Sequence, residues 1–431
     1  MMYSATRLQR GGSILTQAAR SFSSGNSVWG ALTAAPADPI LGLNEAFKKD
    51  TDPRKQLLGM GAYRCDKGKP YILDCVRKSE ERILARNTDH EYTPIDGSQT
   101  YRERCATLAL GENSEIIKSK RFAGCQTISG TGSLRVGLTF LKDWFPNKNA
   151  KVYVPDPTWP THRGIAEKAG YEWVNYRYYD KSIKGFNLNG MLEDLDKAEK
   201  EQIVILHSCA HNPTGCDPTE EQWKQILEVV KRKNHFVGFD TAYQGFSSGN
   251  LDKDAYSLRL FSEHTDRLCL FQSFAKNFGL YGERAGCLVF AADSEKEAQV
   301  VSSRIKMIAR PMYSSPPVHG ARIVDEILGD AELTKSWHQD LIHMSSRMAQ
   351  MRSGLVDKLK EKGSTHDWSH VITQIGMFAY TGLSTEQVNK LREDYHIYMT
   401  GDGRISIAGL NTSNLDYVAE AFHNVSKDHP L

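Results

Sequence analysis

The feature that most constrains this fold is a series of short apolar runs that alternate with helical patterns. Each run is too short for a helix and is typical of a buried strand. The runs lie at Lys151–Pro155, Ile203–Leu206, Phe236–Asp240, Leu268–Ser273 and Gly286–Phe290. Strands separated in this way by helices predict right-handed crossovers and a mostly parallel sheet.

One of the intervening helices has clear sequence signals. Thr219 and Gln222 have the spacing of a capping box at the start of Thr219–Asn234. Apolar residues then recur at helical spacing, at Trp223, Ile226, Leu227 and Val230. After about Asp330 the alternation of strands and helices ends. A long helical stretch then precedes two further predicted strands, Gln374–Gly382 and Arg404–Ala408. These strands indicate a separate, smaller unit.

Composition excludes several classes of protein. The 431 residues are 40% hydrophobic and 25% charged, which is ordinary for a globular chain. The formal net charge is +2, so no overall basic excess indicates nucleic-acid binding, and no apolar run of about 18 residues indicates a membrane span. The eight cysteines form no C-x-x-C pair and have no zinc-type spacing. We therefore expect neither a metal centre nor a disulfide framework.

The first residues predict a targeting segment. No Asp or Glu occurs before Asp38, whereas Arg7, Arg10 and Arg20 stand among several serines. An arginine-rich, serine-rich and acid-free N-terminus is typical of a mitochondrial transit peptide. We expect this peptide to occupy residues 1–22; the alternative is an N-terminal tail without a targeting role.

Polar side chains follow three of the predicted strands. His207 and Asn212 come after the strand at 203–206, and Lys276 comes three residues after the strand that ends at Ser273. Asp240 ends the strand between them and is followed by Tyr243. Because ligands bind beyond the carboxyl ends of parallel strands, we expect these groups to meet at one edge of the sheet.

The segment Ile128-Ser-Gly-Thr-Gly-Ser-Leu-Arg-Val-Gly137 is a small-residue turn that leads into an apolar helix. Such a turn offers free N–H groups and a positive helix end to a phosphate. A Walker loop would need Lys where Leu138 stands, and a dinucleotide fingerprint would need Gly where Arg135 stands. Taken alone, the segment is equally compatible with a plain strand-to-helix turn.

Lys276 and Asp240 each have a functional and a structural interpretation. A lysine beyond a buried strand can lose its proton easily and form a Schiff base, although most lysines are solvated surface charges. Asp240 could cap the next turn, or it could be the fixed anion that keeps a ring nitrogen protonated, as pyridoxal phosphate requires. Tyr243 could then reach the hydroxyl of that ring. Arg310 and Arg404 are two guanidinium groups that would suit a substrate with two carboxylates.

Together these motifs resemble the aspartate aminotransferases, which are class I pyridoxal-phosphate enzymes of fold type I, and above all their mitochondrial form. The resemblance extends from about Val28 to the C-terminus. Its ordered motifs are SGTGSLRVG, CAHNPTG, FDTAYQGF, SFAKNFGLYGERAG, QIGMFAYTG and DGRIS. It implies an α/β fold: a large domain with a mostly parallel seven-stranded sheet flanked by helices, and a smaller α/β domain built from both chain ends. The implied boundaries are 23–69 for the N-terminal arm and part of the small domain, 70–343 for the large cofactor-binding domain, and 344–431 for the rest of the small domain.

The resemblance also implies a role for each site residue. Lys276 would hold the cofactor and, once released, move the proton, with Asp240 on the pyridinium nitrogen and Tyr243 and Asn212 on the ring oxygen. Trp159 would stack on the ring and would also contact substrate, as would Asn212. Arg404 would bind the α-carboxylate, and Gly61 would belong to a segment that closes over substrate. The phosphate would be held by Ser129, Gly130, Thr131, Ser273 and Arg284. His162 and His207 match positions close to Asp240.

Two residues are implied to act across a two-fold dimer interface. Tyr92 would reach the partner's phosphate, and Arg310 would bind the distal carboxylate of the partner's substrate. The family usually has Ser-Asn-Pro-Pro where this chain has Ser314-Ser315-Pro316-Pro317. We expect Ser315 to alter the affinity for the distal carboxylate without abolishing activity.

The implied activity is transamination between L-aspartate and 2-oxoglutarate, giving oxaloacetate and L-glutamate. It would be ping-pong through the pyridoxamine form, in a homodimer of the mitochondrial matrix. Within the subfamily, an aromatic-amino-acid aminotransferase is the alternative. A nicotinamide oxidoreductase is a weaker alternative, because Arg135 stands where the dinucleotide-binding pattern needs Gly. It would also leave Lys276 and Asp240 without a role. A non-enzymatic binding protein on this scaffold is the third alternative.

Overall fold

The computed structural model describes residues 28–35 and 41–428, so the predicted transit peptide lies outside the described residues. Residues 28–35 belong to a separate unit and contain a turn in which the Leu32 N–H donates to the Trp29 carbonyl at 2.9 Å. None of the helices within the described ranges is both long and apolar enough to cross a membrane.

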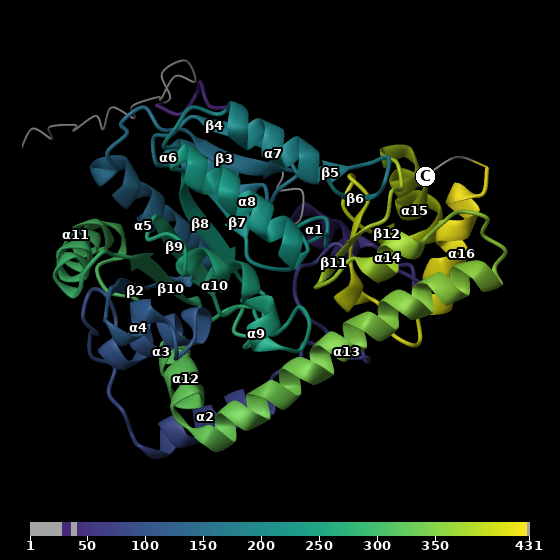
Figure 1. Cartoon of the computed structure of the whole chain (residues 1–431). Coiled ribbons are helices and arrows are strands. Elements are labelled where there is room, and N and C mark those ends of the chain that lie inside the picture. Colours follow the sequence, from purple (N-terminus) through teal and green to yellow (C-terminus); the bar gives the residue numbers. More distant parts are fainter. Residues whose placement is uncertain (1–27, 36–40, 429–431) are drawn as a thin grey trace, which may run out of the picture. The chain divides into compact units, whose positions relative to one another are not determined.

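A seven-stranded mixed sheet forms the centre of the fold (Figure 1). Its spatial order is β2-β10-β9-β8-β7-β3-β4, and every strand except β10 runs in the same direction. The strands are β2 (Phe122–Ile128), β3 (Val152–Asp156), β4 (Trp173–Arg177), β7 (Ile203–His207), β8 (Phe236–Thr241), β9 (Leu268–Ser273) and β10 (Ala285–Ala291). The predicted mostly parallel sheet is therefore confirmed. Strand β10 is antiparallel because the short link from β9 contains no crossover helix, which a parallel return would need.

Helices cover both faces of the sheet, as the alternation of its side chains requires. Ile203 and Ile205 of β7 belong to one buried cluster, whereas Val204 and Leu206 belong to the other. The first face is covered by α5 (Ser129–Trp144), α6 (Thr161–Lys168) and α11 (Glu295–Tyr313). The second face is covered by α3 (Gln99–Leu110), α7 (Leu188–Lys197), α8 (Glu220–Lys233), α10 (Tyr256–Ser262) and α12 (His319–Gly329).

The helix predicted at Thr219–Asn234 is present as α8. Thr219 and Gln222 exchange both hydrogen bonds of the capping box, and Asn234 ends the helix in the left-handed conformation with φ +55°. Shorter elements beside these helices are α4 (Glu115–Lys118), α9 (Leu251–Asp254) and the hairpin of β5 (Tyr179–Asp180) and β6 (Gly185–Phe186).

A long helix, α13 (Ala331–Glu361), packs on α2 (Asp74–Ala85) and α12 near one end and on α14 (Ser369–Thr373) and α16 (Leu415–Ser426) further along (Figure 1). This confirms the long helical stretch expected after Asp330. Two small sheets follow. The first pairs β1 (Gln56–Leu57), which comes after α1 (Leu41–Lys49), with β12 (Ile397–Tyr398), which comes after α15 (Thr385–Tyr395). The second pairs β11 (Phe378–Tyr380) with β13 (Arg404–Ser406).

Two predicted strands are shorter than expected. The strand expected over Gln374–Gly382 is limited to β11, because Gly376 has φ +80° and the Ile375 N–H bonds to Gly215 outside any sheet. The strand expected over Arg404–Ala408 ends at Ser406, where a 3₁₀ turn begins (Ile407–Gly409). The pairing of residues 56–57 with residues 397–398 brings distant parts of the sequence together.

Candidate active site

A cavity of about 190 Å³ lies at the carboxyl edge of the large sheet. It receives side chains from the ends of several strands, as predicted. Its lining includes Ser129, Gly130, Thr131, Trp159, His207, Cys209, Asn212, Asp240, Tyr243, Ser273, Lys276 and Arg284. Eleven of these twelve residues were expected at the site from the sequence; Cys209 was not. The antiparallel strand β10 begins at this edge, so Arg284, which directly precedes it, reaches the same cavity.

One end of the cavity is formed by the first residues of α5. Ser129 has φ +57°, and its hydroxyl lies 2.9 Å from that of Ser273. Gly286 of β10 packs directly behind this turn, and an added Cβ would lie 2.5 Å from the Gln272 carbonyl oxygen and 2.7 Å from the Ser129 backbone. Only glycine allows this approach. The helix N-terminus, the hydroxyls and Arg284 together make this end suitable for an anion.

The amine of Lys276 has no hydrogen-bond partner within the described part of the chain and lies 5.6 Å from the centre of the Tyr243 ring. Burial lowers the pKa of Lys276, an effect opposed by Asp240 and strengthened by Arg284. A lysine in this setting releases its proton more readily than a surface lysine, which a nucleophilic amine requires.

Asp240 is kept ionised by its neighbours. Nε2 of His162 lies 2.9 Å from its Oδ2 atom, and His162 is almost fully buried. Burial on its own would raise the pKa of Asp240, but the hydrogen bond from His162 and the charge of Lys276 contribute to lowering it overall. Asp240 therefore presents a negative charge to the cavity.

A chain of hydrogen bonds continues behind His162. Its Nδ1 atom lies 2.8 Å from Oγ1 of Thr158, and Nε2 of His207 lies 3.5 Å from the same hydroxyl. Nδ1 of His207 accepts the N–H of Asn212 at 3.2 Å, and burial lowers the pKa of His207 to about 3. His207 is therefore neutral with its proton on Nε2, which fixes one direction for the chain: His207 donates to Thr158, Thr158 to His162, and His162 to Asp240.

His162, His207 and Asp240 also form the one cluster within the described ranges whose ligand atoms could surround a metal ion. The hydrogen bonds of these residues account for the cluster without a metal ion. His162 uses one ring nitrogen on Asp240 and the other on Thr158, and a neutral His207 accepts at Nδ1. We assign these atoms to hydrogen bonding, not to metal coordination.

Arg404 lies beside the cavity and is 4% exposed. It donates to Oδ1 of Asn212 at 3.3 Å and to the Gly59 carbonyl at 3.1 Å, and it stacks on the Phe378 ring at 4.3 Å. Its buried Nε has no hydrogen-bond partner, and no described carboxylate forms an ion pair with it. Burial lowers the pKa of Arg404, against the opposing charge of Asp402. A buried guanidinium without a carboxylate partner is suited to bind an anionic ligand.

Gly61 packs against the Phe378 ring on which Arg404 stacks, and an added Cβ at Gly61 would lie 3.1 Å from that ring. Tyr92 and Arg310 are not part of the cavity in this chain. Tyr92 is 86% exposed, and Arg310 is exposed and donates to the Ser314 hydroxyl at 2.8 Å. Their expected roles toward a partner subunit stay predictions, as does the effect of Ser315.

Thr158 and Phe378 were missed as site residues. Thr158 could have been found by the rule that found the others, because it follows the carboxyl end of β3. Phe378 lies inside a strand and has no polar signal; only the fold brings it against Arg404.

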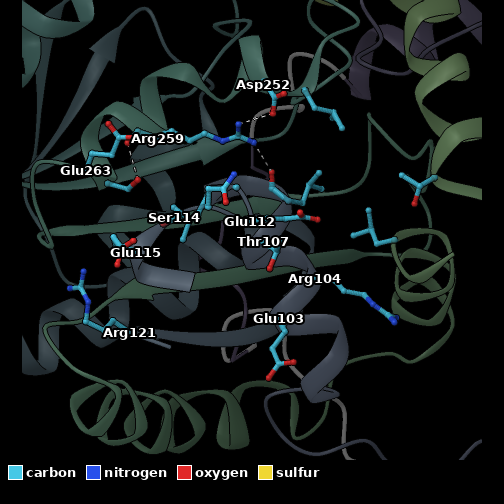
Figure 2. Close-up of a pocket in the computed structure, with 18 of the residues that line it drawn as sticks. Glu103, Arg104, Thr107, Glu112, Ser114, Glu115, Arg121, Asp252, Arg259 and Glu263 are labelled. Carbon is cyan, nitrogen blue, oxygen red and sulfur yellow. Dashed lines mark hydrogen bonds and ion pairs between the residues drawn. The ribbon is translucent and has the colours of Figure 1, made fainter. Parts of the chain in front are cut away.

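A larger cavity of about 1330 Å³ lies between α3, α9 and α10 (Figure 2). Its cationic side chains pair with neighbouring carboxylates, as in Arg259–Asp252 at 2.7 Å, Arg121–Asp266 at 2.9 Å and Arg104–Asp325 at 2.6 Å. Because its arginines are already paired with carboxylates, we do not regard it as the active site. The smaller cavity instead combines an unbonded amine, a fixed carboxylate and an anion-binding turn.

Comparison with known proteins agrees with this choice. The profile of the aminotransferase class I and II family matches residues 53–422. The chain belongs to this family. It is 50% identical over 410 residues to the mitochondrial aspartate aminotransferase of Dictyostelium discoideum, covering 95% of this chain and 96% of that protein.

Solved structures show the same aminotransferase fold. A mitochondrial aspartate aminotransferase from Trypanosoma brucei is 45% identical with a TM-score of 0.87, over 89% of this chain and 100% of that one. An aromatic-amino-acid aminotransferase from Burkholderia pseudomallei, covalently bound to pyridoxal phosphate, is 43% identical with a TM-score of 0.89, over 93% of this chain and 100% of that one. The predicted fold class and family are therefore confirmed.

Proposed function

We propose that this aminotransferase uses pyridoxal phosphate to exchange the amino group between L-aspartate and 2-oxoglutarate. The observation that carries the proposal is that Lys276 and Asp240 line one cavity with the start of α5, beside the buried and unpaired Arg404. The names of its relatives support aspartate as the substrate. When bound, the cofactor supplies an electron sink for the bond that is broken at the substrate Cα.

The residues that line the cavity fit this cofactor in their charges and in their arrangement from one end of the cavity to the other. Asp240 would pair with the protonated ring nitrogen at one end, and Tyr243 and Asn212 would hydrogen-bond the ring oxygen. Trp159 would cover one ring face. The phosphate would lie at the start of α5 and is expected to be held by Ser129, Gly130, Thr131, Ser273 and Arg284.

Lys276 has two tasks in this proposal. It would hold the cofactor covalently between reactions, and its free amine would then take the proton from the substrate Cα and return it to the cofactor. Its lowered pKa supports both tasks, because a neutral amine is needed in each. Gly61 and its neighbours would close over the bound substrate and exclude water.

Two arginines would select dicarboxylic substrates. Arg404 would bind the α-carboxylate, and Arg310 of one protomer would bind the distal carboxylate in its partner's site, where Tyr92 would also reach the phosphate. A substrate lacking one carboxylate leaves a cation unpaired, which gives strong discrimination. The exposure of Tyr92 and Arg310 in the single chain supports a homodimer with shared sites.

We further propose that the protein acts in the mitochondrial matrix after removal of residues 1–22. The acid-free, arginine-containing N-terminus and the mitochondrial names of its relatives support this location. We also propose that residues 70–343 form the large domain, with 23–69 and 344–431 forming the arm and the small domain.

An absorbance spectrum of the purified protein loaded with pyridoxal phosphate tests the activity. We expect a pH-dependent band that L-aspartate bleaches and L-phenylalanine bleaches far less. Equal bleaching by both would instead favour an aromatic aminotransferase. This alternative has support from the similar structure of the aromatic-amino-acid aminotransferase of Burkholderia pseudomallei. A protein that gives no band would contradict the proposal and favour a binding protein on this scaffold.

The variant Lys276→Ala provides the matched control. It is expected to bind pyridoxal phosphate without the covalent band and to show almost no turnover. Near-normal activity of this variant would overturn the assignment of Lys276.

A further inference from the structure

The loop between β7 and α8 carries Asn212 into the cavity, and its start is held by a carboxylate from its own end. Oδ2 of Asp217 accepts the Ala210 N–H at 2.6 Å, and Oδ1 accepts the His211 N–H at 2.9 Å. Ala210 has φ +50°, so consecutive N–H groups turn toward one point and form an anion-binding nest. The chain thus fills this nest with its own side chain.

Further bonds make the loop a closed unit. The Gly215 N–H donates to the His211 carbonyl at 2.7 Å, and Nδ1 of His211 lies 2.8 Å from the Thr214 hydroxyl. Gly215 has φ +67°, and an added Cβ would lie 2.8 Å from the Phe378 carbonyl oxygen. The Gly215 carbonyl accepts the Ile375 N–H at 2.8 Å, which ties the loop to the segment that carries Phe378.

Two hydrogen bonds of Asn212 depend on the position of this loop. Its N–H bonds to His207, and its side-chain oxygen accepts from Arg404. A shift of the loop would therefore disturb both the hydrogen-bond chain behind Asp240 and the guanidinium that faces the substrate. Asp217 itself is not among the residues that line the cavity.

The carboxylate of Asp217 destabilises the folded state. Burial raises the pKa of Asp217 to about 6, although the two N–H groups lower it, and the nearby Asp254 raises it further. No cation among the described residues forms an ion pair with Asp217. A half-buried carboxylate without a cationic partner weakens stability, so its place beside the site points to a functional reason for it.

We propose that Asp217 is a positioning residue that holds Asn212 in register with the cofactor ring oxygen and with Arg404. The inference rests on the proposed function. It assigns Asp217 no contact with substrate or cofactor; Asp217 acts through the Ala210 and His211 amides.

The variant Asp217→Asn tests the proposal, because it keeps the side-chain size but offers an amide group where one of the two N–H donors needs an acceptor. We expect the pH midpoint of the cofactor absorbance band to move toward that of Asn212→Ala. We also expect kcat/KM for aspartate to fall roughly tenfold, the scale of weakening one or two hydrogen bonds.

The variant Asp254→Asn is the matched control. Burial likewise raises the pKa of the Asp254 carboxyl to about 6, and Asp254 accepts the N–H groups of Gly245 and Ser248 at 2.8 and 3.2 Å. We expect a comparable change in thermal stability with an unchanged absorbance midpoint. A midpoint shift in this control equal to that of Asp217→Asn would overturn the positioning role.

A double-mutant cycle separates positioning from general damage. If Asp217 acts through Asn212, Asp217→Asn adds little to the midpoint shift already present in Asn212→Ala. Additive effects, or a wild-type midpoint in Asp217→Asn, would overturn the inference. A wild-type protein with no cofactor band would instead contradict the proposed function, so the two failures are distinguishable.

Discussion

Nε2 of His162 and Oδ2 of Asp240 lie 2.9 Å apart at the end of a buried hydrogen-bond chain that begins at the Asn212 backbone. Every donor in this chain meets an acceptor, so the hydrogen bond from His162 stabilises the charge on Asp240 in addition to the nearby Lys276. The contact links the edge of the sheet to the expected position of the ring nitrogen. The first prediction follows from it.

Replacing His162 by Asn shortens the side chain and breaks its bond to Asp240. Because that bond lowers the pKa of Asp240, we expect the pKa to rise and the acid limb of the kcat profile to move to higher pH. We expect kcat to fall by roughly tenfold to a hundredfold, the scale of one charge-assisted hydrogen bond. The exposed His319→Asn is the control, and an unshifted acid limb in His162→Asn would contradict the prediction.

The lowered pKa of His207 predicts how the stability of the protein depends on pH. Its folded pKa, about 3, lies below the unfolded value of 6.5, so the unfolded chain binds more protons between these values. His207 therefore contributes stability that is present above pH 6.5 and is lost as the pH falls toward 3.

Urea unfolding at fixed protein concentration, at about pH 7 and about pH 5, measures this contribution; we expect His207→Asn to lose about 2 kcal/mol less than wild type between them. Buried His211 stays in both proteins and cancels in the difference. Equal losses in the two proteins would show that His207 takes up a proton as readily in the folded state as in the unfolded state, which would contradict the prediction.

The capping box of α8 gives a prediction outside the site. Thr219→Ala removes the hydroxyl that accepts the Gln222 N–H at 3.3 Å, and we expect unfolding to become easier by about 1 kcal/mol. Ser353→Ala is the control, because the Ser353 hydroxyl only bonds back to preceding carbonyls within α13. Urea unfolding of both variants should show a loss only for Thr219→Ala, with aspartate turnover unchanged in each.

The large sheet was predictable because its strands are locally encoded. The run at 203–206 is apolar throughout, and the run at 268–273 is apolar up to Phe271, so their burial follows from composition, and the parallel direction follows from the helices between them. Strands β2 and β4 carry weaker signals. Glycine, cysteine and glutamine interrupt β2, and exposed Asn175 and Arg177 interrupt β4. Their place in the sheet depends on neighbouring strands and not on their own sequence.

The site was predictable for a related reason. Residues at strand ends, such as Asp240 and Ser273, share an edge whenever the strands are parallel, whatever the details of packing. The direction of the hydrogen-bond chain through Thr158 was not predictable, because it depends on ring orientations that only the folded structure supplies. The same holds for the bonds from Asp217, which join residues of a single loop whose backbone turns at Ala210.

Arg404 supplies the last prediction. Arg404→Lys keeps the charge but loses the planar fork that could bind a carboxylate through two parallel bonds and also reach Asn212 and Gly59. We expect kcat/KM for aspartate to fall at least about a hundredfold, mainly through KM, since a bidentate charged contact is lost. The control is Arg347→Lys, because Arg347 is also buried and donates to a backbone carbonyl, that of Leu410. That control should lower the melting temperature while leaving KM within about twofold, the range of a change remote from the bound substrate. If Arg404→Lys also kept a wild-type KM, the α-carboxylate would have to bind elsewhere, and the unpaired Nε of Arg404 would need another partner.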